Sequence, residues 1–111
     1  MVNLVEATLL RIYLGEKDHS DGHPTFETIV RRAREAGLAG ATVLRGPLGF
    51  GHSSQLHSAK ILDLSDDLPL VVEIVDHSDK IDAFLPVVDA LLRGGLITLE
   101  KVRIVQSSAR P

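Results

Sequence analysis

Two glycine-rich turns hold the residues of this sequence best suited to binding a ligand. The first, RGPLGFGH, spans residues 45–52, and the second, RGG, spans residues 93–95, with Lys101 further along. Glycine lets a backbone approach a ligand closely, a turn can aim several N–H groups at an anion, and arginine offers two parallel donors to a phosphate. We therefore expect an anionic ligand such as a phosphorylated nucleotide, with the ring of Phe50 covering its base. The predicted ligand-binding residues are Arg45, Gly46, Gly49, Phe50, Gly51, His52, Arg93, Gly94, Gly95 and Lys101.

The first turn nearly matches a phosphate-binding P-loop, but it departs from that motif in two ways. His52 stands where the motif requires lysine, and an extended segment follows where the motif requires the N-terminus of a helix. We therefore reject the P-loop. The glycines of both turns can also be explained by tight or bulged backbone geometry alone, and this alternative stays open.

The five histidines raise metal binding as the alternative function. His19, Asp21 and His23 alternate in one loop, and His52 and His57 flank another. Imidazole and carboxylate groups suit zinc or copper. Their spacing matches no established metal site, so no residue is assigned as a metal ligand.

The sequence offers no combination of side chains typical of catalysis. Ser53 and Ser54 lack the strand-turn-helix context of a nucleophile elbow, and the chain has no cysteine. The carboxylates lie mainly at turns and helix starts and form no acid–base pair. These carboxylates are Asp63, Asp66, Asp67, Asp76 and Asp79. We expect a protein without enzymatic activity and without a cofactor.

Composition narrows the classes of partner. The net charge of −3 and the aromatic content of 4% argue against nucleic acid, which requires a basic face and often aromatic stacking platforms. Glu6 and Arg11 interrupt the N-terminal apolar stretch, and no apolar run reaches the ~20 residues of a membrane span. We expect a cytoplasmic protein without membrane insertion.

Hydrophobic periodicity predicts a single domain over residues 1–111 in the order strand, helix, strand, hairpin arm, strand, helix, strand. Strands are predicted at 6–14, 39–45, 56–64, 68–76 and 96–105, with a loop at 15–23. Helices are predicted from Pro24 to Gly37 and from Ser78 to Gly94, with Gly37 as a left-handed C-cap and Ser78 as an N-cap. This is an α+β, ferredoxin-like βαββαβ sandwich, with an antiparallel sheet, two helices on one face and an extra hairpin arm.

The second face of the predicted sheet carries apolar side chains that no predicted helix covers. These are Leu9, Val71 and Val75. A sheet face open to water should be polar. We therefore expect other copies of the chain to cover it, in a homotrimer.

The run GLAGATVLRG…GFG over residues 37–51 resembles the second strand and loop base of the PII signalling proteins, and LPLVVEIV resembles the PII strand that follows that loop. Over residues 9–105 the chain is similar to DUF190, an uncharacterised bacterial and archaeal family of the PII-like superfamily. The resemblance implies a PII-like homotrimer that binds adenine nucleotides between subunits and relays ligand state to a partner protein through a mobile loop. The metal alternative resembles the copper-tolerance proteins of related fold.

Two departures from the PII pattern bear on nucleotide binding. The long loop is shortened here to about residues 51–56. The sequence Thr98-Leu99-Glu100-Lys101 stands where PII proteins carry a second glycine pair before the lysine of their phosphate-contacting loop.

Overall fold

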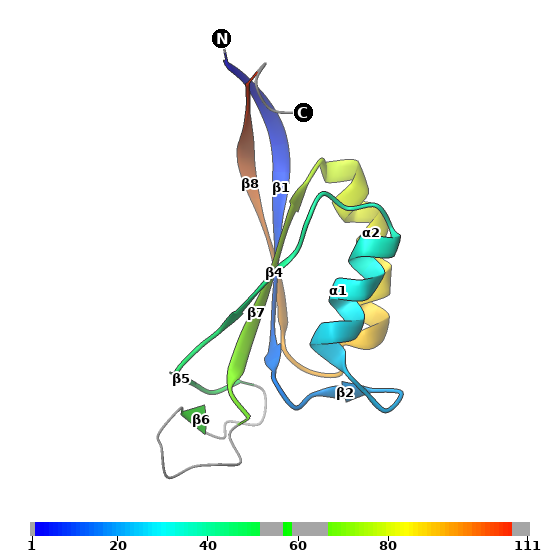
Figure 1. Cartoon of the computed structure of the whole chain (residues 1–111), viewed down its shortest axis with the longest axis vertical. Helices are drawn as coiled ribbons and strands as arrows, with labels where there is room; N and C mark the ends of the chain where they lie inside the picture. The colour runs from blue at the N-terminus through cyan, green and yellow to red at the C-terminus, as the bar shows by residue number, and fades with distance from the viewer. Residues whose placement is uncertain (1, 52–56, 59–66, 108–111) are drawn as a thin grey trace.

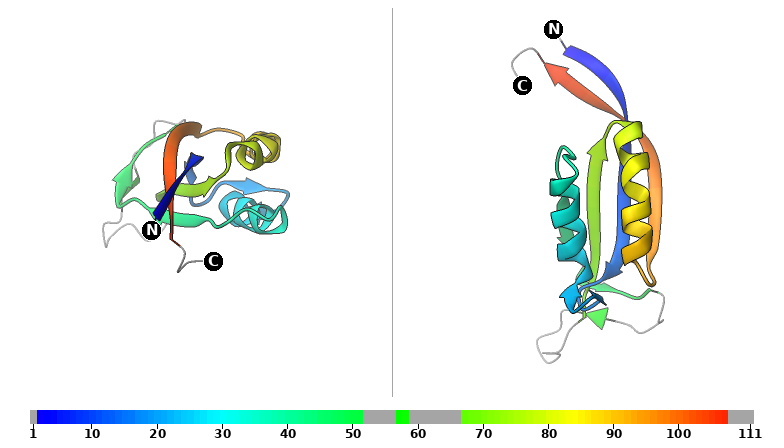
Figure 2. Two further views of the ribbon diagram at one scale, coloured as in Figure 1. Left: turned by 90° about the horizontal axis from the view of Figure 1, so that it is seen from above. Right: turned by 90° about the vertical axis from the view of Figure 1, so that its right-hand side faces the viewer.

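The computed structural model describes residues 2–51, 57–58 and 67–107, and it contains the predicted ferredoxin-like sandwich. Four antiparallel strands form one sheet in the order β4-β7-β1-β8. Their bounds are Val2–Gly15 for β1, Thr42–Arg45 for β4, Pro69–Asp76 for β7 and Leu96–Ser107 for β8. The helices α1 (Thr25–Glu35) and α2 (Ser78–Leu91) lie side by side on one face of the sheet (Figures 1 and 2).

The core lies between the sheet and the two helices, where the predicted alternation is confirmed. The even-numbered apolar residues of β1 from Leu10 to Leu14 and of β7 from Leu70 to Ile74 point toward the helices and are buried. Among the described residues, the largest fully buried side chains are Leu10, Ile12, Val72, Ile74, Ile29, Ile81 and Val88. Each such side chain contributes roughly 1.5–3 kcal/mol by leaving water, so this layer dominates the stability of the fold. None of the helices in the described ranges is long and apolar enough to cross a bilayer.

Two short hairpins accompany the sheet. β2 (His19–Ser20) pairs with β3 (His23–Pro24) inside the segment predicted to be a loop, because Asp21 and Gly22 both adopt positive φ, which is typical of a two-residue hairpin turn. The predicted hairpin arm is present, since β5 (Leu48–Gly49) pairs with β6 (His57–Ser58). The rest of the strand predicted at 56–64 lies outside the described residues.

Strand lengths differ from the predictions at both ends of the sheet. β1 begins at Val2 rather than at residue 6, because it pairs with β8 from Val2↔Ser107 onward. The two strands form a ribbon that extends beyond the helices (Figures 1 and 2). β4 begins at Thr42 rather than at residue 39, because the Ala39 N–H is donated to the Asp76 carboxylate and not to a neighbouring strand.

The two helix-cap predictions have opposite outcomes. Gly37 has φ +77°, and the Leu38 N–H bonds to the Ala33 carbonyl at 3.1 Å, as in a glycine-terminated helix. The N-cap prediction is wrong, because His77 occupies the cap position with no side-chain cap hydrogen bond. Ser78 instead bonds to the Thr8 hydroxyl at 2.8 Å and so links α2 to β1.

The other face of the sheet is not covered by either helix. The strand register aligns four apolar residues in one row across it, in the order Leu44, Val71, Tyr13 and Leu96. Leu44 is 49% exposed and Leu96 is 56% exposed, although both are large and apolar. Leu9, which we expected to need an external cover, is already buried within the chain. Val71 and Val75, which we also expected to need a cover, are half-buried, so Leu44 and Leu96 are the more exposed apolar side chains of the row.

A charged row follows the apolar row on the same face. Arg11 of β1 donates to Glu73 of β7 at 2.9 Å and to Glu100 of β8 at 3.3 Å. The hydrogen bond to Glu73 raises the pKa of Arg11, so its positive charge is fixed at any ordinary pH. The network links three neighbouring strands, and its charged side chains lie beside the apolar row.

Asp76 is a buried carboxylate that joins three parts of the fold. One oxygen accepts the Ala39 N–H at 2.9 Å from the loop after α1, and the other accepts the His77 N–H at 2.7 Å at the start of α2. Only 4% of the residue is exposed. Both backbone donors would lose their partner if the carboxylate were removed.

We predict that Asp76→Ala lowers the free energy of unfolding by roughly 2–4 kcal/mol, because two N–H groups are left without their charged acceptor. Urea denaturation measures the loss. Asp82→Ala is the matched control, since Asp82 is exposed on α2 and a surface substitution of this kind changes stability by less than about 0.5 kcal/mol. Equal midpoints for the two variants would show that Asp76 has no such role.

Candidate functional site

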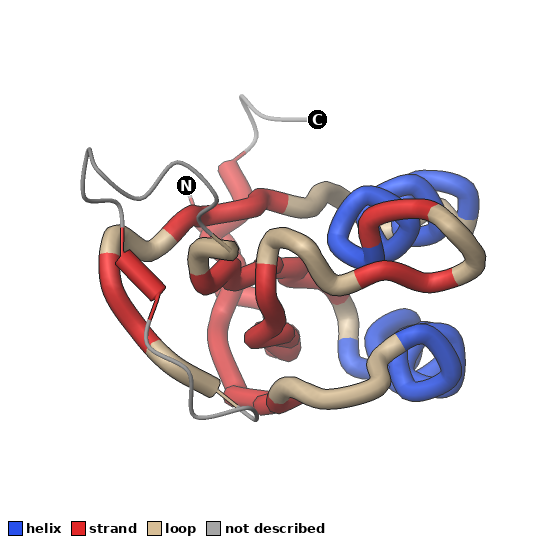
Figure 3. Tube along the Cα trace, turned by 90° about the horizontal axis from the view of Figure 1, so that it is seen from below, coloured by secondary structure: helices blue, strands red, loops and turns tan. Residues whose placement is uncertain are grey.

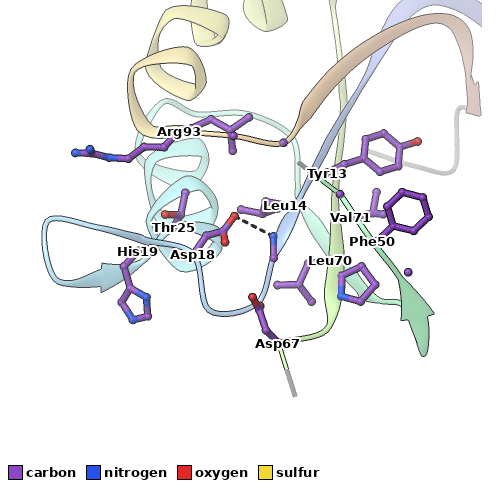
Figure 4. Close-up of a pocket in the computed structure, with 17 residues that line it drawn as sticks. Tyr13, Leu14, Asp18, His19, Thr25, Phe50, Asp67, Leu70, Val71 and Arg93 are labelled. Atoms are coloured by element: carbon purple, nitrogen blue, oxygen red, sulfur yellow. Dashed lines mark hydrogen bonds between the residues drawn. The ribbon is translucent and has the colours of Figure 1, made fainter. Parts of the chain in front are cut away.

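A pocket of about 450 Å³ lies at the end of the sheet where β1 ends and β7 begins. Figure 3 views the molecule from this end, and Figure 4 shows the lining side chains. The two glycine-rich turns, which are far apart in the sequence, both contribute to the lining. The first provides Gly49, Phe50 and Gly51, and the second provides Arg93, Gly94 and Gly95.

The remaining predicted site residues are placed differently. Arg45 and Gly46 lie outside the lining, although the Gly46 N–H bonds at 2.8 Å to the carbonyl of Pro69, which is part of it. Lys101 lies along β8 opposite Thr8, away from the pocket. His52 lies outside the described residues.

Gly95 fixes the second turn against β1. Its φ is +85°, and a Cβ atom at this position would lie 2.2 Å from the carbonyl oxygen of Tyr13. Real Cβ contacts are never this short, so the position accepts glycine alone. The close approach brings the α2–β8 turn to the last residues of β1, and the pocket forms beside that junction.

Two carboxylates of the lining shape the turn that follows β1. Asp18 accepts the Gly15 N–H at 3.0 Å, and Asp67 accepts the Lys17 N–H at 2.8 Å. A Cβ on Gly15 would lie about 3 Å from oxygens of both carboxylates, so glycine leaves room for them. The sequence signal for Asp18 is its place in the turn GEKD, but nothing local connects that turn to Asp67, which is 49 residues further on.

The β2–β3 hairpin is held to both helices by a buried hydroxyl pair. Ser20 Oγ lies 2.8 Å from Thr25 Oγ1 at the start of α1, and it donates to the Leu91 carbonyl at 2.9 Å at the end of α2. Thr25 also lines the pocket. These bonds fix the helix-side wall, on which Arg93, Asp18 and His19 lie in Figure 4, while Tyr13, Val71 and Phe50 lie on the opposite side.

The hairpin register separates two histidines of the metal alternative, while His52 and the side chain of His57 lie outside the described part of the chain. His19 pairs with Pro24 and Ser20 pairs with His23, and residues that are paired across strands share a face whereas consecutive residues alternate. His19 and His23 therefore point to opposite faces. Within the described ranges, no group of three or more histidine, aspartate or glutamate side chains could hold a metal ion.

The charge of the lining differs from the basic site that the arginines suggested. Among the described residues, the lining contains Asp18 and Asp67 against a single arginine, Arg93, together with His19. Phe50 is 69% exposed, and Tyr13 is also partly exposed. The arrangement offers one guanidinium, hydrogen-bond acceptors and two aromatic rings.

The architecture and the end-of-sheet pocket place the chain among proteins with the PII-like fold. A putative PII-like signalling protein from Thermus thermophilus matches with a TM-score of 0.67 and 15% identity, over 92% of each chain. CPII from Thiomonas intermedia K12, a nitrogen regulatory PII-like protein bound to ADP, AMP and bicarbonate, matches with a TM-score of 0.63 and 16% identity, over 92% of this chain and 91% of that one. The B. subtilis GlnK–ATP complex matches with a TM-score of 0.53 and 15% identity, over 87% and 82%.

Sequence similarity identifies the family. Residues 7–104 match the model of DUF190, described as "Uncharacterized ACR, COG1993", and the chain belongs to this family. A UPF0166 protein from Aquifex aeolicus (strain VF5) is 38% identical over 104 residues, covering 94% of this chain and 98% of that protein. A UPF0166 protein from Methanocaldococcus jannaschii is 32% identical over 97 residues, covering 86% and 89%.

We predict that Gly95→Ala destabilises the protein by at least about 2 kcal/mol more than Gly37→Ala. Both glycines have positive φ, so both variants incur the ~1–2 kcal/mol left-handed penalty, but a Cβ on Gly37 would meet nothing within 4 Å. The difference therefore reports the clash with Tyr13. Chemical denaturation measures both losses, and equal values would mean that the β1 contact is not required.

Proposed function

We propose that the protein is a PII-like ligand-sensing regulatory protein, without enzymatic activity, that binds an adenine nucleotide or a similar anionic ligand at this pocket. The observation that carries the proposal is the meeting of Gly49–Gly51 and Arg93–Gly95 around one cavity. Glycine backbones give a ligand close access to N–H groups, and an adjacent arginine gives it a cation.

The lining suits the separate parts of a nucleotide. Arg93 can donate two parallel hydrogen bonds to a phosphate. The exposed ring of Phe50 and the ring of Tyr13 offer apolar faces to a base, since stacking on aromatic side chains is favourable for every base. Solved proteins of this fold have been described in complexes with ADP, AMP and ATP, which supports this class of ligand.

We further propose that the protein works as a homotrimer in which each pocket is completed by a neighbouring subunit. The apolar row Leu44–Val71–Tyr13–Leu96 supports this, because an exposed apolar row on a sheet face is stabilised when another surface covers it. Tyr13 belongs to both the row and the pocket lining, so a subunit packed on the row would stand next to the pocket. Ligand state would then reach a partner protein through the segment after Gly51.

We predict that the protein binds at least one of AMP, ADP and ATP, and that Arg93→Ala weakens this binding about ten- to a hundredfold. The loss corresponds to one charge-assisted hydrogen bond of about 1.5–3 kcal/mol. Isothermal titration calorimetry measures the dissociation constants. Arg32→Ala, on the exposed surface of α1, is the control for a general charge effect and should bind like the wild type. Wild-type affinity in the Arg93 variant would remove this residue from the site.

We predict a trimer at micromolar concentration, measured by size-exclusion chromatography with light scattering. Leu96→Glu should shift the mass toward the monomer, because it places a carboxylate at one end of the proposed apolar interface. Leu48→Glu is the control, since Leu48 is similarly exposed but is not part of the row. A wild-type monomer would contradict the proposal.

A further inference from the structure

Glu16 holds the guanidinium of Arg45 in an ion pair beside the pocket. Arg45 ends β4 and Glu16 follows β1, and both of these strands pair with β7, which lies between them. The pair therefore spans β7 at the level where Gly15 pairs with Pro69 and Arg45 pairs with Leu70. Gly15, Pro69 and Leu70 all line the pocket, so the ion pair stands at its rim.

The backbone fixes both members of the pair in place. The Glu16 N–H donates to the Leu68 carbonyl at 2.9 Å, and the Gly46 N–H donates to the Pro69 carbonyl at 2.8 Å. The Glu16 side chain is 25% exposed, whereas that of Arg45 is 59% exposed. The carboxylate is thus held close to the protein while the guanidinium remains accessible to a second anion.

We propose that Glu16 is a specificity-determining residue that competes with the ligand for Arg45 and so limits the negative charge that the pocket accepts. This inference rests on the proposed function. A phosphate that approaches Arg45 must either displace the carboxylate or lie beside it. The repulsion grows with each added phosphate charge, because like charges a few ångströms apart repel even when solvent screens them. Asp18 and Asp67 of the pocket lining add to this repulsion of the phosphates. Glu16 therefore favours nucleoside monophosphates over triphosphates.

The test compares Glu16→Gln with the wild type by calorimetry, with adenosine, AMP, ADP and ATP as probes at one ionic strength. Glutamine keeps the size and a hydrogen-bond acceptor but removes the charge. A partly exposed ion pair is worth a factor of about two to five in an equilibrium constant. We expect no change for adenosine and a gain that rises from AMP to ATP, reaching about two- to fivefold for ATP.

Two further variants isolate the mechanism. Glu35→Gln removes the same charge from the exposed C-terminal end of α1, opposite the end at which Thr25 lines the pocket, and should leave the affinities unchanged. In an Arg45→Ala background, Glu16→Gln should give a smaller gain in affinity, because the guanidinium for which Glu16 and the phosphate compete is absent. If Glu16→Gln proves unstable in thermal denaturation, Glu16→Ala replaces it in the same series.

The outcomes separate the inference from the function on which it rests. If the wild type binds nucleotides and Glu16→Gln gives no gain, or the same gain for every probe, the role of Glu16 is overturned and the proposed function stands. A gain that Glu35→Gln matches also overturns it. If no variant binds any of the four probes, the proposed function fails, and the inference fails with it.

Discussion

The contact between Gly95 and the carbonyl of Tyr13 is the constraint on which the rest of the site depends. It brings the turn after α2 to the last residues of β1. The glycine-rich segment that follows β4 begins at the same end of the sheet. This backbone contact places the second turn at the pocket, and the pairing of β4 with β7 brings the first turn to the same end of the sheet. Any side chain at this position would separate the turn from the strand.

Most of the fold could be predicted because its determinants are local. Alternation along β1 and β7 and the spacing of Ile29, Ile81 and Val88 identify the core without knowledge of the topology. Predictions failed where a side chain bonds to a distant backbone group. Asp76 shortens β4 by accepting the Ala39 N–H, and it satisfies the His77 N–H at the start of α2, where Ser78 was expected to act as the cap.

The candidate site was predictable in part for the same reason. The glycine-rich segments, including the one that contains Arg93, can be recognised as turns in the sequence, because unusual backbone geometry favours glycine. Arg45 is different: its environment depends on Glu16, 29 residues away, and on the order of the strands. Asp18 and Asp67 converge only because the sheet brings the ends of β1 and β7 together. Residue type alone therefore suggested a more basic pocket than the chain forms.

The long ribbon of β1 and β8 has a consequence for how the molecule folds. β1 leaves the ribosome before the other strands of the sheet, yet each of its two neighbours, β7 and β8, belongs to the second half of the chain. Closing a loop as long as the one between Val2 and Ser107 costs about 4 kcal/mol of chain entropy. β1 therefore has no partner in the sheet until β7 has been synthesised, and it pairs with β8 later still. This non-local pairing predicts slow sheet formation, whereas α1, whose hydrogen bonds are local, can form before β7 is available.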